Sequence, residues 1–213
     1  MLAILDYGAG NQTSVARALE HLGAPAFITS DPAALGKASG VIFPGVGSAG
    51  QAMANLRENG MDKALADIVK RGQPLLGICL GCQILLSDSD EDNTPALDII
   101  PGHCRAFPAD MSEADGNPCR VPHMGWNSIS KRRDSPLLDG IDPEAEFYFV
   151  HSYYVEPPEE MIIATTTHGM EFCSIYGRDG LWAVQFHLEK SGEPGLRMLN
   201  NFYNYCRGRS HVV

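Results

Sequence analysis

The first 90 residues alternate continuous apolar runs with segments whose apolar residues recur at helical spacing. Residues 2–6 (LAILD) form the first apolar run, and Val15, Ala18, Leu19 and Leu22 follow at helical intervals. Further strands are predicted at residues 26–29, 40–43 and 74–79, with a helical stretch at about 49–71. Continuous apolar strands that alternate with helices are typical of a parallel sheet covered by helices on both faces.

From about residue 103 to 186 the pattern changes to short β-rich runs separated by Gly, Pro and Asp. Strands are predicted at residues 147–155, 161–166, 172–176 and 181–186, and a last helix at about 193–206. This region is expected to extend the sheet in antiparallel fashion. No Gly- or Ser-rich linker divides the chain, so the sequence predicts a single α/β domain over residues 1–213: a mostly parallel central sheet, flanking helices and an antiparallel β extension.

The net charge of the chain argues against two classes of partner. A formal charge of -10 and a pI near 5.0 repel nucleic acid and anionic lipid. The only basic cluster, residues 131–133, is too short for a typical nucleic-acid tract and is expected in a solvated loop. The apolar run at the N-terminus is too short for a signal sequence or a membrane span, which predicts a cytoplasmic protein with six free thiols.

A cysteine flanked by glycines marks the first candidate for chemistry. In Gly77-Ile78-Cys79-Leu80-Gly81 the cysteine directly follows an apolar strand and precedes a helical run. A nucleophile on a sharp strand-to-helix turn needs small neighbours, because the turn crowds the backbone. The unpaired NH groups of the following helix can hold an oxyanion. The pattern predicts that Cys79 is a nucleophile.

A thiol nucleophile needs a base, and His187 is the histidine with a carboxylate placed to orient it. It is followed two residues later by Glu189 at the end of an apolar run. In an extended segment side chains two residues apart project to the same side, so the carboxylate is expected to orient the imidazole. The loop Pro44-Gly45-Val46-Gly47 also follows an apolar strand and is expected beside Cys79, with backbone NH groups toward a developing oxyanion.

Other interpretations of these residues have weaker support. Cys79 and Cys82 form a C-x-x-C pair, which is typical of a redox pair or of half a zinc site. No second C-x-x-C or H-x3-H follows at zinc spacing, and a redox motif is expected early in a thioredoxin-like chain. A stand-alone cysteine peptidase or amidase is expected to hold its histidine on a loop soon after the nucleophile, whereas His187 lies 108 residues further on. A non-catalytic regulator has no need of the Cys, His and Glu together.

The chain carries three motifs in a characteristic order and spacing: P-G-V-G, G-I-C-L-G-C-Q and Q-F-H-L-E-K-S. With them it resembles the class I glutamine amidotransferases, which have a flavodoxin-like fold. Three segments narrow the resemblance to the glutaminase subunits of imidazole glycerol phosphate synthase: D-Y-G-A-G-N at 6–11, P-H-M-G-W-N at 122–127 and Y-F-V-H-S-Y at 148–153. A paralogous glutaminase that feeds a related synthase is the alternative. Leu188 stands where the family usually has proline.

The resemblance implies a function in histidine biosynthesis. Cys79, His187 and Glu189 would hydrolyse glutamine to glutamate and ammonia, and a (β/α)8-barrel cyclase partner would use the ammonia to make imidazole glycerol phosphate and AICAR. No metal or organic cofactor is implied. By resemblance, Val46 and Leu80 form the oxyanion hole; glutamine is held by Gly45, Gly47, Leu80, Gln83, Ser152 and Tyr153; and the partner is contacted by Asn11, His123, Trp126 and Asn127.

Overall fold

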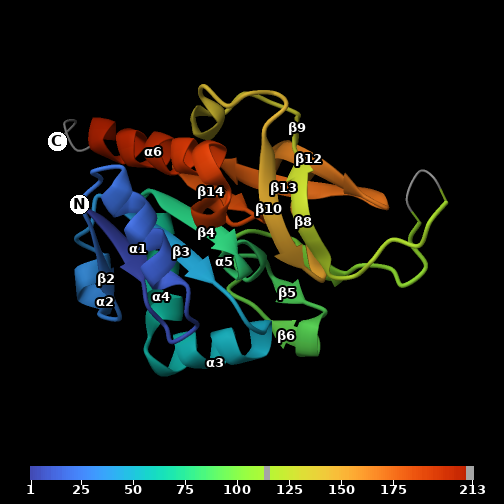
Figure 1. Cartoon of the computed structure of the whole chain (residues 1–213). Helices are drawn as coiled ribbons and strands as arrows, with labels where there is room; N and C mark the ends of the chain where they lie inside the picture. The colour runs from blue at the N-terminus through green and yellow to red at the C-terminus, as the bar shows by residue number, and fades with distance from the viewer. Residues whose placement is uncertain (113–115, 210–213) are drawn as a thin grey trace.

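The parallel half of a large central sheet is built from the first strands of the chain and one late strand (Figure 1). In the computed structural model, which describes residues 1–112 and 116–209, these strands run in the order β2, β1, β3, β4 and β14. Their bounds are β1 Leu2–Leu5, β2 Ala26–Thr29, β3 Gly40–Gly45, β4 Leu75–Cys79 and β14 Leu181–Val184. All four pairings among them are parallel, which confirms the predicted sheet.

Beyond β14 the sheet continues with mostly antiparallel strands, as predicted. They are β13 Met170–Arg178, β11 Tyr153–Glu156, β7 His103–Ala106, β5 Asp88–Ser89 and β6 Thr94–Pro95. Two more strands branch from β13: β12 Ile162–His168 and then β9 Ser130–Lys131. Only the β5–β7 pairing in this part is parallel among the described residues.

The prediction of one strand over residues 147–155 is wrong. The run divides at Ser152 into β10 (Glu146–His151) and β11. β10 pairs with β8 (His123–Ser128) in a separate two-stranded sheet, whereas β11 joins the large one. The chain therefore passes from one sheet to the other at Ser152, because each half of this apolar run packs on a different surface.

Helices cover both faces of the large sheet (Figure 1). Side chains of α1 (Gln12–His21) and α6 (Gly192–Arg209) pack in one core, and those of α3 (Ala49–Glu58) and α4 (Met61–Lys70) pack in the other. Shorter helices are α2 (Pro32–Leu35) and α5 (Leu80–Gln83). The helical stretch expected at 49–71 is two helices, because Gly60 has a left-handed φ of 68° and separates them.

Alternation along the strands creates the two cores. Leu2 and Ile4 face the α1–α6 side, whereas Ala3 and Leu5 face the α3–α4 side, and all four are fully buried. Burial of apolar surface on both faces is the main stabilising contribution to this arrangement. Among the described residues, no helix is both long and apolar enough to cross a membrane.

Candidate active site

Cys79 ends β4 at the sharp turn that its flanking glycines predict. Its backbone adopts φ 54° and ψ -109°, a strained conformation for a residue with a side chain. A Cβ at Gly81 would overlap the carbonyl oxygen of Phe43, and one at Gly77 would lie 2.9 Å from the carbonyl oxygen of Gly81. The glycines are required because α5 packs this closely on both β3 and β4. The helix after the turn, α5, spans four residues.

His187 and Glu189 form a buried pair beside the cysteine. His187 Nδ1 and Glu189 Oε1 are 2.7 Å apart, and the two side chains are 1% and 0% exposed. The sequence predicted that an extended segment would bring these two side chains together, and this is wrong. Strand β14 ends at Val184, and Leu188 begins a 3-10 helix over Leu188–Lys190. The tight turn, rather than strand alternation, brings the carboxylate back to the imidazole.

Glu189 is also held by a residue from the N-terminal end of the chain. Asn11 Nδ2 donates a hydrogen bond to Glu189 Oε1 at 2.8 Å and lies 3.5 Å from His187 Nδ1. Asn11 precedes α1 in a left-handed conformation, with φ 72°. Leu188, in place of the usual proline, is fully buried in the core. Side-chain hydrogen bonds and core packing thus fix the carboxylate without a proline ring.

His187 and Glu189 each stabilise the charged form of the other. Burial alone would lower the pKa of His187, but interactions with Cys79 and Glu189 outweigh burial and raise it to about 10. Burial would raise the pKa of Glu189, but His187 and the Asn11 amide hold it below its ordinary value. An imidazolium beside a carboxylate stabilises a neighbouring thiolate.

Two buried glutamines form a second set of side chains near the cysteine. Gln185 Nε2 lies 3.9 Å from Cys79 Sγ as a donor, and Gln83 Nε2 donates to Gln185 Oε1 at 3.2 Å. Both glutamines are buried. Gln83 was expected at the site, whereas Gln185 was missed, although its position two residues before His187 is a usable signal.

A cavity of about 390 Å³ opens over Cys79. Its lining residues are Val46, Gly47, Cys79, Leu80, Gln83, Glu91, Pro122, Val150, His151, Ser152, Tyr153, His187 and Lys190. The structure thus brings together most of the residues expected to bind glutamine, from three separate stretches of chain. Gly45 does not line the cavity; it ends β3, where a Cβ would overlap the Tyr7 hydroxyl and lie 2.9 Å from Leu80 Cβ.

Glu91 lines the cavity and was not predicted. It sits in the acidic stretch 87–93, and its Oε2 accepts a hydrogen bond from the Ala49 NH at the start of α3, at 2.7 Å. Burial raises the pKa of Glu91, and the bond from Ala49 opposes that shift. The sequence shows the acidic stretch but not which of its members faces the cavity, because that depends on the strand pairing of β5 with β7.

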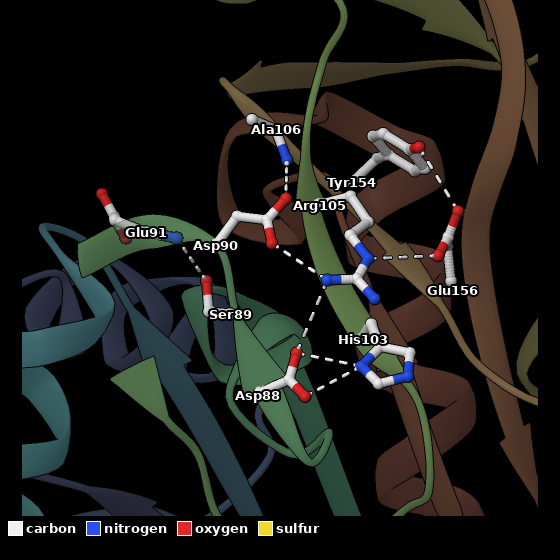
Figure 2. Close-up of polar contacts among 9 residues, drawn as sticks. All are labelled: Asp88, Ser89, Asp90, Glu91, His103, Arg105, Ala106, Tyr154 and Glu156. Carbon is white, nitrogen blue, oxygen red and sulfur yellow. Dashed lines mark hydrogen bonds and ion pairs between the residues drawn. The ribbon is translucent and has the colours of Figure 1, made fainter. Parts of the chain in front are cut away.

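The neighbouring acids of this stretch are engaged with Arg105 of β7 (Figure 2). Arg105 Nη1 lies 3.0 Å from Asp90 Oδ1, and its Nε lies 3.5 Å from Glu156 Oε2. Asp90 also accepts a hydrogen bond from the Ala106 NH at 3.1 Å, which together with Arg105 lowers the pKa of Asp90. These bonds pin the segment before Glu91 to β7, so Glu91 is directed to the cavity.

The residues expected at a partner surface differ in exposure. Trp126 on β8 is 54% exposed, next to the Tyr148 ring of β10 at 6.0 Å between ring centres. Met124 on the same strand face is also exposed. His123 points the other way and is buried, and Asn127 donates inward to the Thr167 carbonyl at 2.9 Å. Asn11 is half-buried, and its side chain donates to Glu189.

The described parts of the chain, 1–112 and 116–209, contain no group of three His, Cys, Asp or Glu side chains arranged to hold a metal ion. Within the same residues no disulfide joins any of the six cysteines. Cys82 is buried, and burial raises its pKa well above the ordinary value, so it is a poor nucleophile.

Comparison with known proteins agrees with this geometry. The family model for glutamine amidotransferase class-I matches residues 3–206. An imidazole glycerol phosphate synthase subunit HisH from Desulfovibrio desulfuricans is 66% identical over 207 residues, which cover 97% of this chain and 95% of the relative. The chain belongs to the HisH family of class-I glutamine amidotransferases.

Another HisH relative, from Nitratidesulfovibrio vulgaris, is 65% identical over 212 residues and covers 100% of both chains. A solved glutamine amidotransferase has a TM-score of 0.74 at 18% identity, covering 97% of this chain and 98% of the other. PurLQS from Thermotoga maritima has a TM-score of 0.68 at 16% identity, covering 96% and 97%. At such identities the structures show the common fold alone. The resemblance to the HisH family and the predicted fold class are confirmed.

Proposed function

We propose that this chain is the glutaminase subunit of an imidazole glycerol phosphate synthase in histidine biosynthesis. The observation that carries the proposal is a cavity lined by Cys79 and His187, with Glu189 buried behind His187, in a chain of the HisH family. The reaction is hydrolysis of the side-chain amide of glutamine to glutamate and ammonia.

In the first half of the reaction, Cys79 Sγ attacks the amide carbon of glutamine. The thiol proton passes to His187, which gives a proton to the departing amide nitrogen, so ammonia leaves and a thioester forms. In the second half, His187 takes a proton from water, the resulting hydroxide attacks the thioester, and glutamate and the Cys79 thiol are released. Glu189 holds the imidazole in the tautomer that carries a proton on Nδ1.

The cavity offers complementary groups for the rest of glutamine. The backbone NH groups of Val46 and Leu80 are assigned to the oxyanion, because both residues line the cavity beside Cys79. Gly47, Gln83, Ser152 and Tyr153 surround the substrate. The Glu91 carboxylate can pair with the α-ammonium group of glutamine, because it is the acidic side chain that lines the cavity away from the triad.

The partner in this proposal is a (β/α)8-barrel cyclase that receives the ammonia. The relatives are named as subunits, which supports an assembly of more than one chain. Exposed Trp126 and Met124 on β8 offer an aromatic and apolar surface close to the strand that leads into the cavity.

The test is glutamate release from glutamine by the purified chain, alone and with the cyclase subunit of imidazole glycerol phosphate synthase and its nucleotide substrate. Release that rises when partner and nucleotide are added supports both the chemistry and the pathway. Release that does not change when the partner is added supports the glutaminase activity but contradicts the pathway assignment. No release under any condition overturns the proposal.

A further inference from the structure

The segment that joins β10 to β11 lines the cavity just where the chain passes between two sheets. The Ser152 carbonyl accepts a hydrogen bond from the Phe107 NH at 3.2 Å. The Tyr153 carbonyl instead accepts two side-chain hydrogen bonds, from His151 Nδ1 at 2.7 Å and from Gln83 Nε2 at 3.2 Å. Because a carbonyl only accepts, His151 carries a proton on Nδ1.

The other nitrogen of His151 continues a directional chain of hydrogen bonds. His151 Nε2 lies 3.0 Å from His123 Nδ1, and His123 Nε2 lies 3.2 Å from Asn127 Nδ2. The Asn127 amide is fixed, because its Oδ1 accepts from the Ser128 NH at 2.9 Å and its Nδ2 donates to the Thr167 carbonyl. Each contact then has one donor and one acceptor, provided that both imidazoles are neutral.

Burial satisfies that condition. It lowers the pKa of His123 to about 4 and that of His151 to about 3, and the neighbouring histidines add to both shifts. Both rings pack among aromatic side chains, with Phe149 stacked on His123 and Phe172 beside His151. At neutral pH the two histidines are therefore uncharged, and each has a single tautomer.

The same chain of contacts reaches the nucleophile at its far end. Gln83 Nε2, which donates to the Tyr153 carbonyl, also donates to Gln185 Oε1, and Gln185 Nε2 faces Cys79 Sγ. Buried side chains thus link β8 to Cys79 through the wall of the cavity. His151 and Gln83 both bond the Tyr153 carbonyl, and the bond from His151 is the shorter.

We propose that His151 is a positioning residue for glutamine: its Nδ1–H holds the Tyr153 carbonyl, and with it Gln83, in the arrangement that binds the substrate. His123 supports this role by fixing the tautomer of His151. The inference rests on the proposed glutaminase function. It predicts that loss of the Nδ1 donor weakens glutamine binding more than the reactivity of Cys79, since His187 and Glu189 are untouched.

Three variants of His151 separate the donor from the ring. In His151→Asn the amide nitrogen takes the place of Nδ1, whereas in His151→Gln it falls near Nε2, and His151→Phe keeps a ring without donors. With the cyclase partner present, KM for glutamine in His151→Asn is expected to stay within about threefold of the wild-type value. In His151→Gln and His151→Phe it is expected to rise about tenfold. The value of kcat is expected to change less than KM.

Two reagents separate binding from reactivity. Alkylation of Cys79 by iodoacetamide needs only the activated thiol, so its rate is expected to match wild type in all three variants. Alkylation by the glutamine analogue 6-diazo-5-oxo-norleucine needs the cavity, so it is expected to slow in His151→Gln and His151→Phe. His21→Phe, at an exposed histidine of α1, is the matched control and is expected to behave as wild type.

An unchanged KM for glutamine in His151→Phe overturns the inference. An equal rise of KM in His151→Asn and His151→Gln also overturns it, as does alkylation of Cys79 that is slowed equally with both reagents. Where His151→Phe does not fold, the comparison of the two amide variants decides. Failure of the wild-type chain to release glutamate with its partner counts against the proposed function instead, and is seen before any variant is made.

Discussion

The charge of His187 depends on its two neighbours, which makes it the most informative single residue of the site. Burial opposes its charge, but Cys79 and Glu189 outweigh burial and raise its pKa to about 10. In Glu189→Gln the carboxylate is lost, so the imidazolium is less stable and the pKa of His187 is expected to fall. Titration of the imidazole by NMR measures this shift, and glutamate release is expected to drop by at least about tenfold.

Glu193→Gln is the matched control, because it removes the same charge from an exposed position in α6. It is expected to leave the titration of His187 near that of wild type. A pKa of His187 that is equally high in Glu189→Gln and wild type would show that the carboxylate does not hold the imidazolium.

The His187–Glu189 pair also predicts how stability depends on pH. The raised pKa of His187 stabilises the fold fully below its unfolded value of about 6.5, and this contribution is lost as pH rises toward 10. The lowered pKa of Glu189 contributes above its unfolded value of about 4.3 and is lost in acid. The loss of unfolding free energy in Glu189→Gln, measured by urea denaturation, is therefore expected to be largest near pH 5–7 and to shrink toward pH 10.

At this scale the sequence identified the candidate triad because glycine flanks and H-x-E spacing are local signals. The contact between Asn11 and Glu189 was not predicted, and the assignment of Asn11 to the partner surface stays a prediction. Gln185 and Glu91 were missed. Asn11 and Glu91 reach the site only through tertiary packing of segments far apart in the chain, which no local pattern encodes.

The turn between β4 and α5 is tightly constrained by packing. A Cβ at Gly81 would overlap the Phe43 carbonyl of β3, which is backbone and cannot rotate away. Gly81→Ala is expected to lower the free energy of unfolding by about 2–3 kcal/mol and to displace Cys79. Urea denaturation and the rate of Cys79 alkylation measure the two effects.

Gly208→Ala is the control for Gly81→Ala, because Gly208 lies in α6 and a Cβ placed there would have no neighbouring atom within 4 Å. Its unfolding free energy is expected to stay within about 1 kcal/mol of wild type. Equal effects of the two substitutions would mean that the turn between β4 and α5 is not closely packed.

The elements themselves were predictable where apolar patterning is local. Strands β1 to β4 and helix α6 match their expected positions closely. The transfer of the chain between sheets at Ser152 was not predicted, since residues 147–155 form one continuous β-rich run. Which sheet each half joins is decided by long-range pairing with β8 and β7, not by the run itself.

Over the whole molecule, exposed aromatic surface lies on the same small sheet that borders the cavity. Trp126→Ala is expected to weaken binding of the cyclase partner by about 2 kcal/mol, or roughly 30-fold in Kd, because exposed Trp residues are frequent interface anchors. Calorimetric titration measures the change. Glutamate release by the isolated chain is expected to be unaffected.

Ile28→Ala is the control for Trp126→Ala, since Ile28 is an exposed apolar residue on β2, an edge strand of the large sheet, whereas Trp126 lies on the small sheet. It is expected to leave partner binding unchanged. Equal losses for both variants, or none for Trp126→Ala, would move the partner surface elsewhere. The cytoplasmic location stays a prediction from the sequence.

The most direct test of the proposed chemistry is detection of the acyl-enzyme. Glutamine is mixed with the chain and its cyclase partner, the reaction is quenched in acid, and the peptide that carries Cys79 is examined by mass spectrometry. A γ-glutamyl thioester on Cys79, absent from Cys79→Ser although that variant folds and binds the partner, is the expected result. Glutamate release by Cys79→Ser at the wild-type rate, or a glutamyl group on another residue, would contradict it.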